Sequence, residues 1–444
     1  MEREDVQTNE NAVSSRTAYV VAEINAQNAA LDAASRAEKY AAMKQSPFVF
    51  YRGTNHLYWK DLGQSPNLSP YGGLSTTRTF LGGDMHVNNT GSFDDDQGDI
   101  VFALNDFDET LIGDYQLDVW RLATSLVLVA RERGVFSAAE EAAFVDSFTE
   151  AYLDALEAFA GTNDELTRKF TASNTYGLLD DFLTSIAANE SRSKMLGEWT
   201  SIENGVRRLK TTTNPDLAPV TSAVVSDVIA KMPNYRSTLS GGGTSLSASY
   251  FQVKSVAQRL HAGVGSLGTT RYYVLIEGAT TSQADDRILD VKAESAPSGY
   301  AYIDPAAVSL TNSISGGDMA RRTVIAQKAL GYRVDDHLGY VQLADGKNYA
   351  VRERSPYKGT LDVQDLDTTV RFTKMAEQWG QVLATHHARA DKDWDASVLP
   401  HSFDAVVKSL VNGNHAGFRT QVRTVAIPYA DQVLLDYQSF MASF

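Results

Sequence analysis

Cysteine is absent from the 444 residues of this chain. Disulfide bonds, cysteine-ligated zinc, iron–sulfur clusters and a thiol nucleophile are therefore excluded. Long apolar runs are also missing, because the most apolar stretch covers only residues 122–130 and a bilayer-spanning helix needs about 20 residues. The polar N-terminus lacks the apolar stretch of a signal peptide, which favours the cytoplasm, although an exported form with its signal removed would read the same way.

Positive charge is scarce as well. Lys and Arg number 40 against 55 Asp and Glu, which gives a formal net charge of −15. Such a balance disfavours broad contact with nucleic acid or an anionic membrane, so we expect neither as a partner. What is present is the composition of a folded protein, with 43% hydrophobic and 10% aromatic residues, and a length that predicts about three domain-sized units.

Hydrophobic spacing and turn signals divide the chain into helical and strand-rich regions. Residues 250–310 are rich in short β-favouring runs, and a hairpin is predicted around Asp345-Gly346. Between residues 48 and 108, short apolar runs alternate with Gly, Asn and Asp clusters and predict short strands and loops. Helices are predicted over residues 13–43 (ended by Ser46-Pro47), 117–133, 137–159 (with a Ser137/Glu140 capping box), 319–330 and much of the last hundred residues.

The first candidate for chemistry is the pair of motifs GGDMHVNN (residues 82–89) and ALNDFDE (residues 103–109), separated by a predicted hairpin. Kinase-like enzymes supply their polar centre in this way. Asp84 would accept the proton of an attacking hydroxyl, and Asn89 and Asp106 would hold Mg²⁺, which prefers oxygen ligands. The alternative is that these Asp and Asn residues only form turns.

Three neighbours of these motifs are candidate contacts for substrate or phosphate: Arg52, His86 and Asp108. The planar guanidinium of an arginine suits phosphate or carboxylate recognition. Arg121 is a weaker candidate of the same kind. Its alternative is a structural ion pair with Asp118, three residues earlier on one predicted helix.

The second candidate is a glycine-rich loop, GVGSLG, that lies between two predicted strands. Its residues Gly263, Gly265, Ser266 and Gly268 would let backbone N–H groups approach the phosphates of ATP. Lys292, one strand later in LDVKAES, stands where a kinase places the lysine that pairs with the α- and β-phosphates. A tight hairpin and an edge-strand lysine are the alternatives.

The two candidates appear in the reverse of the kinase order, and a circular permutation resolves this. We therefore predict an α+β, two-lobed protein kinase-like fold in permuted order. The predicted helix over residues 319–330 contains no Glu to pair with Lys292, so Glu294 or Gln327 would have to substitute. The predicted units are an N-terminal helical arm (1–45), a first part of the helical catalytic lobe (46–240), a strand-rich nucleotide lobe (241–355) and a second part of the helical lobe (356–444).

These residues carry a family resemblance. GDMHVNN resembles the GDxHxxN catalytic loop of aminoglycoside phosphotransferase-like kinases, and NDFDE with the later Asp118 resembles their metal-binding loop and following helix. Segments between about residues 36 and 438, such as RAEKYAAMKQSPFVFYRG, LDVWRLATS and YADQVLLDY, are similar to the bacterial family called domain of unknown function 2252. That family is uncharacterised, so the predicted activity depends on the motifs.

The sequence thus predicts an ATP- and Mg²⁺-dependent phosphotransferase acting on an unknown, small-molecule hydroxyl acceptor. A nucleotide-binding pseudokinase or an AMP-transferring enzyme on the same fold is the first alternative. A metallophosphoesterase is a weaker one: Asp84-Met85-His86 and Gly413-Asn414-His415 match parts of its metal motifs, but the rest of the pattern fails. His386 and His387, adjacent on a helix, are expected to be buried and hydrogen-bonded. The oligomeric state cannot be predicted.

Overall fold

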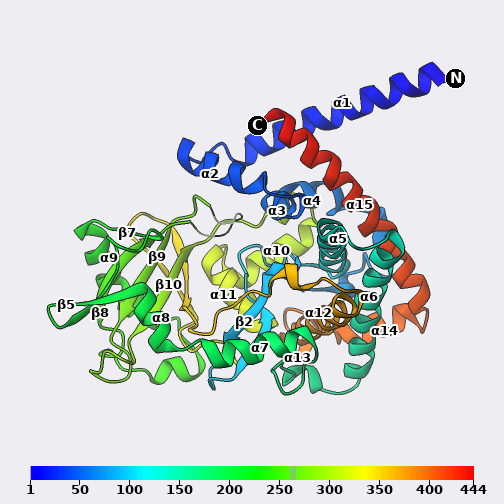
Figure 1. Ribbon diagram of the computed structural model, residues 1–444. Coiled ribbons are helices and arrows are strands. Elements are labelled where there is room, and N and C mark those ends of the chain that lie inside the picture. The colour runs from blue at the N-terminus through cyan, green and yellow to red at the C-terminus, as the bar shows by residue number, and fades with distance from the viewer. Residues whose placement is uncertain (1, 262, 264, 266) are drawn as a thin grey trace.

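The computed structural model describes residues 2–261, 263, 265 and 267–444, with side chains described from residue 15 onward. It is a mixed α+β structure, as predicted, with a strand-rich half and a helical half side by side (Figure 1). Within the described residues, none of the helices combines the length and the apolar character needed to cross a membrane.

The helical half is built around α5 (Gln116–Arg133), in which every residue from Gln116 to Ala130 is buried. Gly380 lets α12 (Thr369–Arg389) lie close to α6 (Ala138–Phe159), because a Cβ at this position would meet the backbone oxygen of Phe148 at 2.3 Å. The other elements of this half are α1 (Glu2–Gln27), α2 (Ala33–Met43), α3 (Pro47–Gly53), α4 (Asn55–Leu62), α6 (Ala138–Phe159), α7 (Leu178–Asn189), α12 (Thr369–Arg389), α13 (Lys392–Asp395), α14 (Phe403–Val411), α15 (His415–Ser443), and the ladders β1 (Arg78–Leu81) with β4 (Leu111–Asp114) and β2 (Thr90–Asp94) with β3 (Ile100–Leu104).

The strand-rich half contains an antiparallel six-stranded sheet in the order β11-β12-β10-β9-β8-β7. Helices α10 and α11 follow β10 in the chain, and α11 packs against β12 and α12. The elements are α8 (Arg192–Trp199), β5 (Thr200–Glu203), β6 (Val206–Leu209), β7 (Leu217–Pro219), α9 (Ser222–Arg236), β8 (Val253–Arg259), β9 (Arg271–Ile276), β10 (Arg287–Ala293), α10 (Pro305–Ser315), α11 (Met319–Leu330), β11 (Gly339–Gln342) and β12 (Asn348–Glu353).

Side chains alternate between the two faces of this sheet, as the period of a strand requires. Leu289 and Val291 of β10 belong to a core that includes Tyr235 of α9. Ile288 faces the other way and packs in a cluster with Trp199 of α8. Lys292 shares that second face, so the sheet presents it toward the helical half.

Several predicted elements are confirmed. The helix predicted over residues 319–330 is α11, and the hairpin around Asp345-Gly346 is β11–β12. The Ser137 hydroxyl and the Glu140 carboxylate form the predicted capping box of α6. β2 and β3 form the predicted hairpin between the two polar motifs.

Other predictions were wrong near the N-terminus. The single helix expected over residues 13–43 is divided into α1 and α2, because Asp32 caps a new helix by accepting hydrogen bonds from the backbone N–H groups of Ala34 and Ser35. Ser46-Pro47 begins α3 instead of only ending a helix, since Ser46 Oγ accepts from Val49 N and proline is tolerated in a first helical turn. The strands expected just after residue 48 are the helices α3 and α4.

The segment between residues 160 and 240 does not belong to one half alone. α7 packs against β3 and α12 in the helical half. β7 pairs with β8, and α9 covers one face of the six-stranded sheet. The sheet therefore includes residues that precede the boundary predicted at 240.

Candidate functional site

Most of the predicted polar residues line one cavity of about 70 Å³. Asp84 and Asn89 enter it from the loop between β1 and β2, and Asp106 and Asp108 from the loop after β3. Arg52 of α3 lies on the same wall. The hairpin β2–β3 thus brings the two sequence motifs together, as their spacing predicted.

The loop before Asp84 is held rigidly by its neighbours. The backbone N–H groups of Gly82 and Gly83 donate to the Asp118 carboxylate at 2.6 and 3.1 Å. The Gly83 carbonyl accepts from Trp59 Nε1 at 2.8 Å and from Asn55 Nδ2 at 3.0 Å. Gly83 itself has a φ of +76°, a conformation that favours glycine.

The carboxylate of Asp84 is paired with Arg121, whose Nε donates to Oδ1 at 2.8 Å and whose Nη2 also contacts Oδ1. His86 Nε2 lies 3.8 Å from the other oxygen, Oδ2. Burial raises the pKa of Asp84 to about 6, with a contribution from Asp106, although Arg121 opposes the shift. The alternative ion pair of Arg121 with Asp118 was wrong, because Asp118 instead accepts from the glycine N–H groups.

Asn89 and Asp106 present oxygen atoms that could bind a metal ion. The Nδ2 group of Asn89 donates to the Asp84 carbonyl at 2.6 Å, so Oδ1 is the atom of its amide that could be a ligand. The Asp106 side chain is 41% exposed. The partial burial of Asp106 acts to raise its pKa. The positive charges of Lys292, Arg352 and Arg271 outweigh this effect, so the pKa of Asp106 is lowered. An ionised carboxylate beside an amide oxygen fits Mg²⁺.

Lys292 on β10 reaches the same group of carboxylates. Its Nζ forms an ion pair with Asp108 and lies 3.9 Å from Asp106 Oδ1. Glu294 and Gln327 were the two residues predicted to partner Lys292 in place of a glutamate on α11. Glu294 accepts a hydrogen bond from Thr323 Oγ1 at 3.1 Å. The other, Gln327, lines a cavity of about 20 Å³ together with Lys292 and Asp108.

The glycine-rich loop between β8 and β9 lies at the edge of the site. Gly265 lines the cavity of about 70 Å³. Gly263 has open space where a Cβ would stand, whereas Gly268 has a φ of +83° and a Cβ there would meet Leu31 Cδ2 at 2.3 Å. Ser266 lies outside the described residues.

The cavity is also lined by residues that the sequence analysis did not single out, among them Glu109 and Lys39. Glu109 accepts from the backbone N–H of Ser298 at 2.6 Å, and burial together with Asp84 raises its pKa to about 7. Lys39 of α2 is buried, which lowers its pKa although Glu109 opposes the shift. Glu109 belongs to the NDFDE motif and could have been proposed from it. Lys39 lies in the segment RAEKYAAMKQSPFVFYRG, which carried the family resemblance but no expectation for this lysine.

Polar atoms without a hydrogen-bond partner in the described structure gather around this cavity. They are Arg52 Nε, Asn55 Oδ1 and His56 Nε2 in its lining, and His86 Nδ1 and Arg121 Nη1 beside Asp84. Buried polar groups are normally satisfied, and unsatisfied ones indicate a missing ligand or water. Arg52, Asn55 and His56 thus have polar atoms in the lining that are available for hydrogen bonds to a polar ligand.

The remaining histidines have structural partners. His386 and His387 are buried and hydrogen-bonded as expected, with His386 Nδ1 2.7 Å from the Leu330 carbonyl and His387 Nδ1 2.9 Å from the Tyr152 hydroxyl. His415 is 3.0 Å from Glu150 and 2.9 Å from Glu157 on α6. Gly413-Asn414-His415, the second fragment of the metallophosphoesterase pattern, therefore contacts α6 through His415 and does not contact the loop of Asp84 in the described structure.

The chain belongs to a family described as uncharacterized proteins conserved in bacteria (DUF2252), whose model matches residues 32–443. This confirms the family resemblance found in the sequence. Neither the curated proteins nor the solved structures contain a significant match.

Proposed function

We propose that this member of the bacterial family is an ATP- and Mg²⁺-dependent phosphotransferase with a circularly permuted kinase-like fold, acting on a hydroxyl group of a small molecule. The observation that carries the proposal is the convergence of Asp84, Asn89 and Asp106 on one cavity that Gly265 also lines and whose Asp108 pairs with Lys292. Phosphoryl transfer is mainly positioning and charge stabilisation, so these groups are chemically sufficient.

The topology supports the permuted arrangement. The glycine-rich loop joins β8 to β9, Lys292 follows on β10, and α11 comes before the hairpin β11–β12. Kinases place a glycine-rich loop over the phosphates and a lysine on the third strand of the lobe. A permuted chain would begin at β8, run to the C-terminus and continue with the N-terminal half. In that order Lys292 comes before Asp84, as it does in a kinase.

Each group has a role that its surroundings support. Asp84, with a pKa of about 6, would orient the acceptor hydroxyl and take its proton. A general base works best when its pKa lies near the pH at which the enzyme operates. Lys292 and the N–H groups of the glycine-rich loop would hold the phosphates. Asn89 and Asp106 would hold Mg²⁺, which would supply charge neutralisation between the β- and γ-phosphates.

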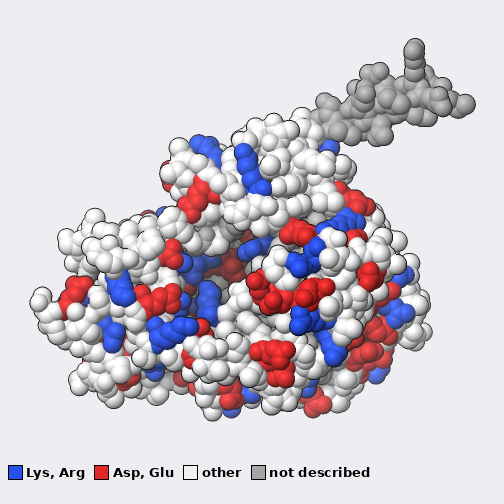
Figure 2. Space-filling view, in the orientation of Figure 1, with Lys and Arg blue, Asp and Glu red and all other residues white. Residues whose placement is uncertain are grey.

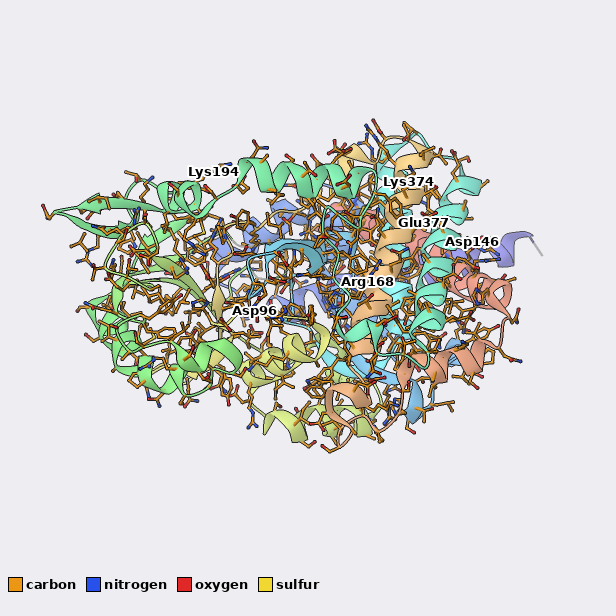
Figure 3. The ribbon with its side chains drawn as sticks, turned by 90° about the horizontal axis from the view of Figure 1, so that it is seen from below. Asp96, Asp146, Arg168, Lys194, Lys374 and Glu377 are labelled. Carbon is orange, nitrogen blue, oxygen red and sulfur yellow. The ribbon has the colours of Figure 1, made fainter. Side chains whose placement is uncertain are left out.

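The first test is calorimetry of Mg-ATP binding to the wild type and to Lys292→Met. We expect micromolar binding that the variant weakens by about tenfold or more, which corresponds to about 1.4 kcal/mol. Lys194→Met is the matched control, since Lys194 is an exposed residue on α8 paired with Glu190 (Figure 3). Absence of Mg-ATP binding to the wild type would refute the proposal. In a separate turnover assay, AMP instead of phosphate on the product would identify the AMP-transferring alternative.

Asp106→Asn is expected to remove most of the Mg²⁺ dependence of ATP binding. The substitution keeps the shape of the side chain but loses the ionised oxygens that favour a divalent cation. Titrating ATP with and without Mg²⁺ should show a ratio of affinities that falls toward one in the variant. Asp367→Asn, at a solvent-exposed aspartate paired with Arg371, should keep the wild-type ratio.

The pH dependence of turnover should have an acidic limb at about pH 6 or below. Asp84 must be ionised to accept a proton and its pKa is raised to about 6, so kcat/KM should rise as the pH increases through this value and then level off. A bound divalent cation would move the limb to lower pH. A rate that falls with increasing pH between 5 and 7 would contradict the assignment of Asp84 as the base.

A further inference from the structure

A second and larger cavity, of about 410 Å³, lies between the two halves. Its lining includes the hairpin β2–β3, the first half of β10, the end of β12, residues 354, 355 and 358, and the end of α12. Asp96 and Arg168, both in this lining, are labelled near the middle of the molecule in Figure 3. The cavity of about 20 Å³ that Lys292 lines lies between this region and the candidate site, because Asp108 also lines the cavity of Asp84 and Arg352 also lines the large one.

A basic cluster lies at this cavity and consists of Arg271, Arg352, Arg354 and Lys358. Arg352, Arg354 and Lys358 line the cavity, and Arg271 lies close enough to Lys358 to act on its charge. Lys and Arg side chains gather in the hollow between the two halves in Figure 2. Arg271 donates through Nε to Asp290 Oδ1 at 2.6 Å. Arg352 Nη1 donates to the Asn105 carbonyl, a neutral group, at 3.0 Å. Arg352 and Lys358 also act on the Asp290 carboxylate, in addition to Arg271. The same three cations act on Asp106, so three positive charges share these two carboxylates.

The other two members of the basic cluster have unused capacity for an anion. Arg354 stacks over Trp199, with its Cζ 4.8 Å from the ring centroid, and its Nε is buried without a hydrogen-bond partner in the described structure. Burial and the neighbouring Arg271 and Arg352 lower the pKa of Lys358 to about 7. By contrast, two other cations in the cavity lining, Arg192 and Arg287, are ion-paired with Glu353.

We propose that the basic cluster binds an oxyanion group of the acceptor, a carboxylate or a phosphate, so that the substrate is an anionic small molecule. This inference rests on the proposed phosphotransferase function. Guanidinium and ammonium groups recognise such oxyanions through charge-assisted hydrogen bonds. A cavity of this volume is typical of small-molecule sites. An acceptor anchored there would extend past Lys292 and Asp108 toward Asp84.

The probes for the test are inorganic phosphate and malonate, titrated separately by calorimetry into the full-length protein. We expect one of them to bind with a dissociation constant of about 1 mM or tighter, and the stronger probe identifies the oxyanion. Lys358→Met and Arg354→Lys should each weaken this binding by about tenfold; the second keeps the charge and loses the planar fork. Lys374→Met, at an exposed lysine of α12 (Figure 3), should bind like the wild type. No binding by the wild type, or binding that Lys358→Met leaves unchanged, would overturn the proposal.

Mg-ATP binding to the same variants separates this inference from the proposed function. Mg-ATP affinity that survives Lys358→Met but not Lys292→Met would assign the basic cluster to the acceptor. Mg-ATP affinity that falls equally in both variants would assign the cluster to the nucleotide and overturn the acceptor assignment. Phosphate or malonate binding that depends on Lys358 in a protein that does not bind Mg-ATP would refute the phosphotransferase function while the anion site remains.

Discussion

Asp84→Asn is expected to lower the turnover of Mg-ATP by two to four orders of magnitude while Mg-ATP affinity stays within about threefold of the wild type. The reason is that the amide could not take the proton of the acceptor hydroxyl, whereas under the proposed function Lys292 and the glycine-rich loop would hold the phosphates. The measurement is ADP release under saturating Mg-ATP, together with calorimetry of Mg-ATP binding. A binding protein without catalytic activity would show no turnover to lose.

The control for this substitution must address stability. Arg121 is fully buried, and removing the charge of Asp84 leaves it without its carboxylate, which costs about 3–5 kcal/mol in comparable buried pairs. Circular dichroism should therefore establish a temperature at which the variant is folded before rates are compared. Arg121→Lys is the matched variant, because it keeps Asp84 ionised and should retain much more turnover than Asp84→Asn. Equal loss in both variants would mean that the pair is structural.

The parts of the fold that the sequence predicted well are those that local interactions decide. The capping box of Ser137 and Glu140 and the hairpin β2–β3 need only residues close in sequence. The segment after Pro47 was predicted as short strands and loops because its short apolar runs alternate with Gly, Asn and Asp clusters. Here Phe48, Tyr58 and Trp59 are buried in helices α3 and α4, so tertiary packing overrides the local preference.

The residues of the candidate site also divide into those that local sequence spacing predicted and those that depend on long-range packing. Asp84, Asn89 and Asp106 were found because one hairpin sets their spacing, and their chemistry is visible in two short motifs. The partner of Arg121 could not be predicted, since Asp118 stands at the right helical spacing but accepts from Gly82 and Gly83. Lys39 lines the cavity from α2, which packs against α3, and no spacing in the sequence links this lysine to Asp84 or Asp106.

Gly83→Ala is expected to destabilise the protein by about 3 kcal/mol or more, and to remove Mg-ATP turnover even in the fraction that folds. Two effects add at this position. An alanine at a φ of +76° is strained, by about 1–2 kcal/mol. Its Cβ would also stand 1.9 Å from the backbone oxygen of Glu109, so the loop of Asp84 and the loop after β3 would have to separate.

Gly205→Ala, in the turn between β5 and β6, is the matched control for this prediction. Gly205 has a similar φ of +81°, but nothing lies within 4 Å of the Cβ that the substitution would add. The control thus reports the backbone strain alone, about 1–2 kcal/mol, and the difference between the two variants in urea unfolding reports the clash with Glu109. Equal midpoints of unfolding would contradict the tight contact between the two loops. A larger loss in Gly83→Ala, with turnover abolished only there, would show that the spacing of these two loops holds Asp84 in its catalytic position.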